Sequence, residues 1–140
     1  MSKAMLTISA RQHHDGGEPE IIELTTEGTL TQSEAGWEIS YEESELTGMA
    51  GVTTTFCIEP GLLRLRRKGK LRSEMVFREG VPHESLYQLD FGALLITVCA
   101  RQISASIGPR GGSVDLLYDI EIERAGSGIV EYHLDIRVVQ

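Results

Sequence analysis

The sequence has no apolar run that approaches the roughly 20 residues needed to cross a bilayer as a helix. Residues 1–10 also lack the cationic region and apolar core of a signal peptide. There are 2 cysteines, Cys57 and Cys99, and without an export signal we interpret both as reduced and structural. These absences predict a cytoplasmic protein that does not associate with membranes.

Positive charge is scarce, because 13 Lys and Arg residues stand against 21 Asp and Glu, for a net charge of −8. Both nucleic acids and anionic membranes need a cationic surface, so any such contact would have to be local. Nearly half of the cations lie within residues 64–72. No aromatic side chain interleaves these cations and no recognition helix is expected, so we predict no nucleic-acid partner.

Motifs for catalysis and metal binding are also missing. No G-x-S-x-G elbow occurs, and the "GPRGGS" run at 108–113 lacks the Lys-Ser/Thr ending of a phosphate loop. His13 and His14 are adjacent on an expected strand and point to opposite faces, while His83 and His133 lack partners at a ligand spacing. We expect no metal, no cofactor and no catalytic residue; an enzyme built on rim residues without a recognisable motif is an alternative.

The sequence does have an alternation of apolar and polar residues with a period of two, as in "GWEISYEE" and "VEYHLDIRV". This period is typical of antiparallel strands with one buried face. Glycine and proline punctuate the chain where it must reverse. We expect ten strands, near residues 4–14, 20–31, 37–43, 51–59, 62–67, 70–78, 84–91, 93–106, 113–124 and 129–139.

Ten strands with short links predict an all-β fold, a single antiparallel meander. Because one apolar face has to be covered, we expect closure into a β-barrel of 8–10 strands, with residues 1–140 as one domain. The inward residues should include Trp37, Ile39, Tyr41, Leu65, Phe77, Tyr118, Ile120, Leu134 and Ile136.

The cationic stretch is expected to be a hairpin. Pairing Leu65 with Leu71 leaves residues 67–69 as a three-residue loop, in which Gly69 would take the left-handed position. The same register sets cations opposite each other on the solvent face: Arg64 with Arg72, and Arg66 with Lys70. Such like-charge pairs are unfavourable, so either acids of neighbouring strands or an anionic partner should compensate them.

Five short pieces resemble the YwiB-like family of uncharacterised bacterial proteins: "YEESELTG" (41–48), "RKGK" (67–70), "MVFREG" (75–80), "YQLDFG" (87–92) and "YDIEI" (118–122). The resemblance covers about residues 5–138 and implies a calycin-like (lipocalin-like) β-barrel. It implies no activity. Leu89 departs from the pattern, where a threonine would be expected, and this weakens the case for a shared polar lumen.

A barrel of this size is either filled by side chains or holds one small ligand. Our first hypothesis is a non-enzymatic barrel that binds a small molecule in or at the mouth of the lumen. An alternative is an interaction module with a packed lumen and the hairpin 62–78 as its contact surface. For the first hypothesis, the candidate ligand-binding residues are Trp37, Tyr41, Arg67, Tyr87 and Tyr118.

Overall fold

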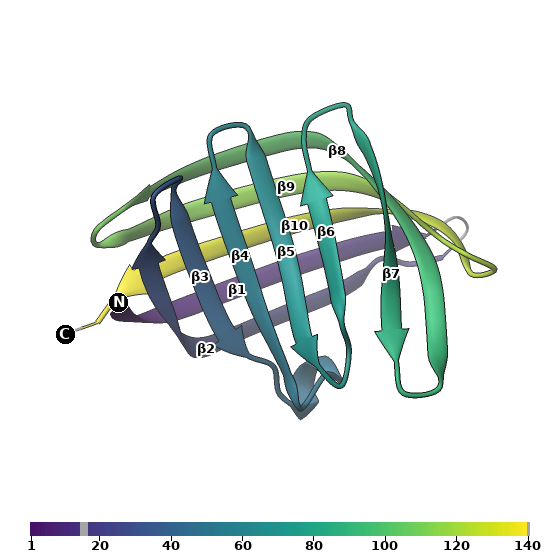
Figure 1. Cartoon of the computed structure of the whole chain (residues 1–140), viewed down its shortest axis with the longest axis horizontal. Helices are drawn as coiled ribbons and strands as arrows, with labels where there is room; N and C mark the ends of the chain where they lie inside the picture. Colours follow the sequence, from purple (N-terminus) through teal and green to yellow (C-terminus); the bar gives the residue numbers. More distant parts are fainter. Residues whose placement is uncertain (15–16, 140) are drawn as a thin grey trace.

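The computed structural model describes residues 1–14 and 17–139, and it is built almost entirely from strands (Figure 1). The strands are β1 (Ser2–His14), β2 (Glu20–Gln32), β3 (Trp37–Glu42), β4 (Val52–Glu59), β5 (Leu62–Gly69), β6 (Ser73–Phe77), β7 (Pro82–Leu89), β8 (Gly92–Gly108), β9 (Gly111–Ile122) and β10 (Gly126–Val138). One short 3₁₀ helix, η1 (Glu45–Thr47), lies between β3 and β4. The predicted strands are confirmed, and the single helical turn falls in the least strand-like stretch of the sequence.

All ten strands belong to one antiparallel sheet with the order β6-β5-β4-β3-β2-β1-β10-β9-β8-β7. The sheet curls until β3–β6 lie in front of the long strands β8, β9, β10 and β1 (Figure 1). Its two edge strands, β6 and β7, meet where Arg72 and Gln88 exchange two backbone hydrogen bonds of 2.9 Å. The result is the expected antiparallel meander, curled into a nearly closed barrel.

The inward residues follow the alternation that the sequence predicts. Every residue of the expected inward set is buried except Trp37, which is partly exposed. Phe91 is a different case, because it is 88% exposed in the turn between β7 and β8 and does not join the core. The alternation of residues along each strand therefore predicts which side chains are buried in the core, but it does not apply to an aromatic residue in a turn.

The expected hairpin register is wrong. β5 runs on to Gly69, and Leu65 pairs with Met75 while Arg67 pairs with Ser73. Gly69 is not a turn residue: it pairs with Val52 of β4, and a Cβ atom there would lie 2.1 Å from the carbonyl oxygen of Gly51. Gly69 does have the expected positive φ, 121°, but at the end of β5, where a side chain would collide with Gly51 beside β4. Arg67 therefore lies in the strand and not in a loop.

This register also removes the expected ladder of opposed cations. Arg66 lies opposite Glu74 and Arg64 lies opposite Val76. The Arg66 guanidinium is 3.8 Å from the Glu74 carboxylate, and the Arg64 guanidinium is 3.5 Å from the carboxylate of Glu59. The acids of neighbouring strands thus compensate these two arginines.

Cys57 and Cys99 are free thiols; Cys57 is buried and Cys99 is partly exposed. Among the residues that the structure describes, no helix has the length and apolar character to cross a membrane.

Candidate functional site

A row of polar side chains crosses the inner face of four strands. The pairing registers place Tyr41 of β3 beside Thr54 of β4, Thr54 beside Arg67 of β5, and Arg67 beside Ser73 of β6. All four residues are at least nine-tenths buried. Because each strand alternates between its two faces, the residues of this row share the inward face with the apolar core. We call these four residues the polar row.

The chain has 4 tyrosines: Tyr41 belongs to the polar row, and the other three lie close to Arg67. The Tyr87 hydroxyl accepts a hydrogen bond of 2.9 Å from Nη1 of Arg67. The hydroxyls of Tyr41 and Tyr132 are 3.4 Å apart, which links the front strands to β10. The Tyr118 ring packs on Phe77 with a centroid distance of 4.7 Å. Aromatic walls with polar tips therefore surround Arg67.

Burial makes three of these tyrosines hard to ionise. It raises the pKa of Tyr41 well above the ordinary value, and the neighbouring Tyr132 hydroxyl and Glu43 carboxylate raise it further. Burial likewise raises the pKa of Tyr118, despite the opposing effect of Arg67. The pKa of Tyr132 is also raised by burial. The hydroxyls are neutral at physiological pH and can act as hydrogen-bond donors or acceptors.

Arg67 is a buried cation. Burial lowers its pKa, but Tyr87, Tyr132, Tyr118 and Glu43 raise it, and the net pKa lies above the ordinary value. Within residues 1–14 and 17–139, no carboxylate comes within the 4.0 Å of an ion pair with its guanidinium. A buried guanidinium without an ion pair carries a desolvation cost, which the hydrogen bond to Tyr87 and the more distant charge of Glu43 offset here.

Glu43 supplies the buried carboxylate of this end of the barrel. Its Oε2 accepts a 2.6 Å hydrogen bond from the hydroxyl of Thr54, and its Oε1 accepts one of 3.0 Å from Thr47 at the end of η1. The sequence reasoning missed Glu43. Extending the alternation Trp37, Ile39, Tyr41 by one step would have placed it on the inward face.

The ladder between β6 and β7 is interrupted. Between the bridges Arg72–Gln88 and Arg78–Val81, the described residues form no pair between these strands. The side chain of His83 occupies part of this stretch, because its Nδ1 accepts a hydrogen bond of 3.3 Å from the backbone N–H of Val76. We call this interrupted stretch the seam.

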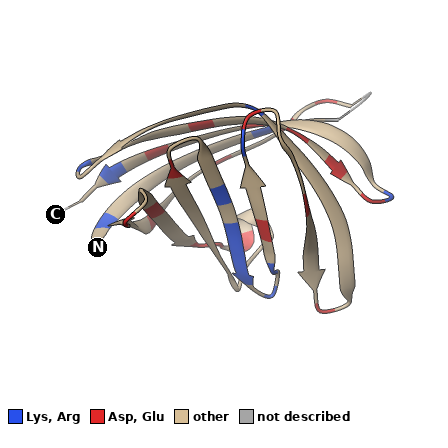
Figure 2. Ribbon diagram, turned by 45° about the horizontal axis from the view of Figure 1, so that its top comes forward, with Lys and Arg blue, Asp and Glu red and all other residues tan. Residues whose placement is uncertain are grey.

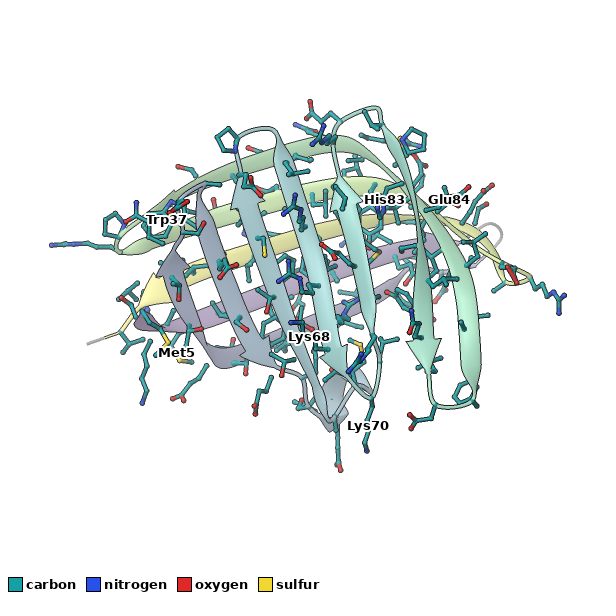
Figure 3. The ribbon with its side chains drawn as sticks, in the orientation of Figure 1. Met5, Trp37, Lys68, Lys70, His83 and Glu84 are labelled. Atoms are coloured by element: carbon teal, nitrogen blue, oxygen red, sulfur yellow. The ribbon has the colours of Figure 1, made fainter. Side chains whose placement is uncertain are left out.

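A groove of about 980 Å³ lies along the seam. It is lined by Arg64, Arg66, Arg67, Lys68, Arg72, Ser73, Glu74, Val76, His83, Glu84, Ser85, Leu86 and Gln88. Residues of both faces of the sheet thus line one groove. In Figure 3, His83 and Glu84 lie at β7 and Lys68 lies at the lower part of β5.

The groove collects the buried polar atoms that have no partner. In the described part of the chain these atoms are three: Nε of Arg67, Oγ of Ser73 and Oγ of Ser85. All three residues line the groove at the seam. Buried polar side-chain atoms are nearly always hydrogen-bonded in proteins, so these three atoms need partners from outside the chain, either a water or a ligand.

Four of the five candidate residues come together. Tyr41 and Arg67 belong to the polar row, and Tyr87 and Tyr118 lie close to Arg67, which is buried inside the barrel. Trp37 does not join them: it lines a separate groove of about 670 Å³ with Ile58, Leu62 and Ile103, at the far left in Figure 3. Sequence reasoning missed Thr54, Ser73 and Ser85, and strand parity was the signal that could have found them.

A second polar cluster lies on the outer surface. Nδ1 of His133 is 2.6 Å from the Asp115 carboxylate and Nε2 is 2.9 Å from that of Asp135. Hydrogen bonds to Asp115 and then to Asp135 raise the pKa of His133. In the chain as described, no group of three or more His, Cys, Asp or Glu side chains could hold a metal ion.

Comparison with known proteins identifies a family and a fold. A family described as "Domain of unknown function (DUF1934)" matches residues 6–136. No curated protein matches. Among solved structures, the crystal structure of the ywiB protein from Bacillus subtilis has 19% sequence identity and a TM-score of 0.88, over 99% of this chain and 93% of that chain. At this identity, the likeness extends to the fold alone.

Proposed function

The chain belongs to the DUF1934 family, a domain of unknown function, and we propose that it is a non-enzymatic barrel that binds the anionic group of a small molecule at Arg67. The observation that carries the proposal is that three buried side-chain atoms without a partner belong to residues that line the seam groove: Arg67, Ser73 and Ser85. An oxyanion supplies acceptors for all three. Hydrogen bonds between ionised groups are short and about twice as strong as neutral ones.

The electrostatics of the polar row favour an anion over a neutral ligand. Arg67 is nine-tenths buried and remains charged, while Glu43 directs its two oxygens to Thr54 and Thr47. A charged donor that is buried without a partner destabilises the protein by roughly several kcal/mol. A bound anion supplies the missing partner, and the free energy recovered in this way favours binding.

The alternative, an interaction module with the hairpin 62–78 as its contact surface, has less support. Arg64 and Arg66 are already close to Glu59 and Glu74. In Figure 2 the cations form a narrow stripe on β5, bordered by acidic positions. We propose accordingly that the protein acts in the cytoplasm, where its two free thiols stay reduced, and that it has no nucleic-acid partner.

The experiment is calorimetric titration of the protein with inorganic phosphate and, separately, with acetate. We expect saturable binding of phosphate with a dissociation constant of about 1 mM or tighter, since two or three charge-assisted hydrogen bonds supply roughly that free energy. The Arg67→Met variant should lose binding, and the exposed control Arg137→Gln should keep it. Absence of binding, or binding that survives Arg67→Met, would overturn the proposal.

Nucleic-acid binding is tested beside it. Fluorescence anisotropy with labelled single-stranded and duplex DNA and RNA at about 0.15 M salt, where the screening length is about 8 Å, should show no binding. If the four cations Arg64, Arg66, Lys70 and Arg72 all contacted phosphates, the logarithm of the binding constant would fall with the logarithm of the salt concentration with a slope of only about −3.5. Sub-micromolar binding that an Arg64/Arg66/Arg72 triple serine variant loses would make the outer stripe the functional surface instead.

A further inference from the structure

The seam groove has an outer part that the inner anion site does not use. Five cationic side chains and two carboxylates line the groove, although the whole chain has a net charge of −8. The groove is therefore locally cationic on an acidic protein. Figure 2 shows this cationic stripe along β5, with β6 between it and the seam.

Two of these cations have no acid to compensate them. Arg64 and Arg66 lie close to Glu59 and Glu74, but in the chain outside residues 15, 16 and 140, neither Lys68 nor Arg72 makes an ion pair. The register that pairs Arg67 with Ser73 brings Lys68 and Arg72 to neighbouring positions across the hairpin. Like charges at such positions repel each other, and an anion between them relieves the repulsion.

The buried donors of the anion site, Arg67 and Ser73, are each next in sequence to an exposed cation, Lys68 and Arg72. On β5, Arg67 is buried and Lys68 is exposed; across the hairpin, Ser73 is buried at the start of β6 and Arg72, just before it, is exposed. Because the ladder between β6 and β7 is interrupted beside them, one groove reaches both sets. A ligand in the seam would thus meet two donor groups in succession.

The geometry points to a ligand that carries two linked phosphates, a diphosphate group: the inner phosphate contacts Arg67, Ser73 and Ser85, and the outer phosphate contacts Lys68 and Arg72. This inference rests on the proposed function, since it uses the same anion site. The groove residues offer three donors without a partner, Nε of Arg67 and the hydroxyls of Ser73 and Ser85, and this number matches the three terminal oxygens of a phosphate better than the two of a carboxylate. Lys68 and Arg72 supply the charge for the second phosphate.

The probes are inorganic phosphate, inorganic pyrophosphate and malonate, titrated calorimetrically into the full chain. We expect pyrophosphate to bind at least tenfold more tightly than phosphate, and malonate to bind more weakly than pyrophosphate. The Lys68→Gln/Arg72→Gln double variant should lose the tenfold difference and keep its affinity for phosphate. Lys70→Gln is the matched control, because Lys70 belongs to the same hairpin and does not line the groove.

The outcomes separate the two proposals. Equal affinities for phosphate and pyrophosphate, with both lost in Arg67→Met, would overturn the diphosphate assignment and leave the anion site standing. Malonate that matches pyrophosphate would overturn the choice of phosphate over carboxylate. If neither phosphate nor pyrophosphate binds, the proposed function fails and the inference fails with it. A pyrophosphate preference that persists in the double variant would show that Lys68 and Arg72 do not hold the second phosphate.

Discussion

The same four strands build two inner regions of opposite chemistry. In the registers of β3 to β6, one row joins Ile39, Phe56, Leu65 and Met75, and the row beyond it joins Trp37, Ile58, Leu63 and Phe77. The polar row, two residues further along each strand in the other direction, joins Tyr41, Thr54, Arg67 and Ser73. Backbone pairing is continuous through all three rows, so the difference lies in the side chains alone.

The comparison teaches that burial has different meanings in the two regions. Phe77 and Leu63 are 0% exposed and contribute through the apolar area that they remove from water. Arg67 is nearly as buried, but its burial costs free energy unless its donors are satisfied. We therefore expect the apolar rows to hold the fold and the polar row to serve binding, and the following predictions test this division.

The largest expected effect belongs to the apolar rows. Phe77→Ala should lower the free energy of unfolding by about 3–5 kcal/mol, because it removes a buried ring and leaves a cavity beside Tyr118. Urea denaturation measures the change, with the exposed Phe91→Ala as the control, since Phe91 is 88% exposed. Similar losses for the two variants would mean that the turn, and not the core row, carries the stability.

Alkaline pH should affect the polar region almost as strongly. The pKa values of Tyr41, Tyr118 and Tyr132 are raised above the ordinary 10.0 in the folded protein, chiefly by burial. Below about pH 10 the tyrosines are protonated in both the folded and the unfolded chain, and the free energy of unfolding is at its full value. Above that pH the unfolded chain ionises first, so the free energy of unfolding falls by about 1.4 kcal/mol per tyrosine per pH unit until the folded pKa values are reached.

Two measurements check this alkaline loss. At about pH 11 the tyrosinate absorbance of the folded protein should be lower than that of the chain unfolded in urea, because the pKa values of Tyr41, Tyr118 and Tyr132 are raised in the folded state. Urea midpoints at about pH 9 and 11 give the loss of stability. Three tyrosines that ionise in the folded chain at their ordinary pKa would contradict the buried arrangement.

A smaller effect is expected for the carboxylate beside the polar row. Glu43→Ala leaves the hydroxyl of Thr54, which is 0% exposed, without its 2.6 Å acceptor. Loss of such a partner costs about 1–3 kcal/mol. Glu43→Gln should lose less, because its amide oxygen can still accept, and the exposed neighbour variant Glu42→Ala should change little. An unchanged midpoint for Glu43→Ala would place this carboxylate outside the folding energetics.

The smallest change, and one of opposite sign, is expected for Arg67. Arg67→Met removes a buried charge that has no ion pair in the described residues, so the free energy of unfolding should stay constant or rise by up to about 2 kcal/mol. Thermal unfolding without added phosphate measures this directly. A loss as large as that of Phe77→Ala would mean that Arg67 is a structural residue, and the division between the two regions would fail.

The alternation of apolar and polar residues in the sequence predicts most of the strands and most of the buried residues of this protein. The alternation in "GWEISYEE" and its counterparts gives the ten strands and nearly all of the inward set, because period two fixes the face of each residue. It gives Arg67 and Glu43 as well, if it is continued past Leu65 and Tyr41. The expected pairing of Leu65 with Leu71 prevented that continuation at Arg67, because it placed residues 67–69 in a loop.

Other features need the closed barrel. The apolar residues of the hairpin, Leu63, Leu65, Leu71, Met75 and Phe77, allow more than one register, and the contact of Gly69 with β4 decides between them. Tyr118 and Tyr132 meet Arg67 only because the sheet curls. Nothing in the local sequence of β6 and β7 marks the seam, since both are ordinary strands that happen to end the sheet.

The strand order has a consequence for the rate of folding. Among the ladders of the described residues, β1 with β10 is the one that joins strands distant in sequence, and the backbone N–H of Val139 donates to the carbonyl of Lys3 at 2.9 Å beside it. Hairpins form before distant strands meet, because the entropy of closing a long loop delays the latter. A circular permutant, with a short peptide joining the two ends and an opening in the turn 79–81, would make every ladder local. Such a chain should fold faster while it keeps the same barrel.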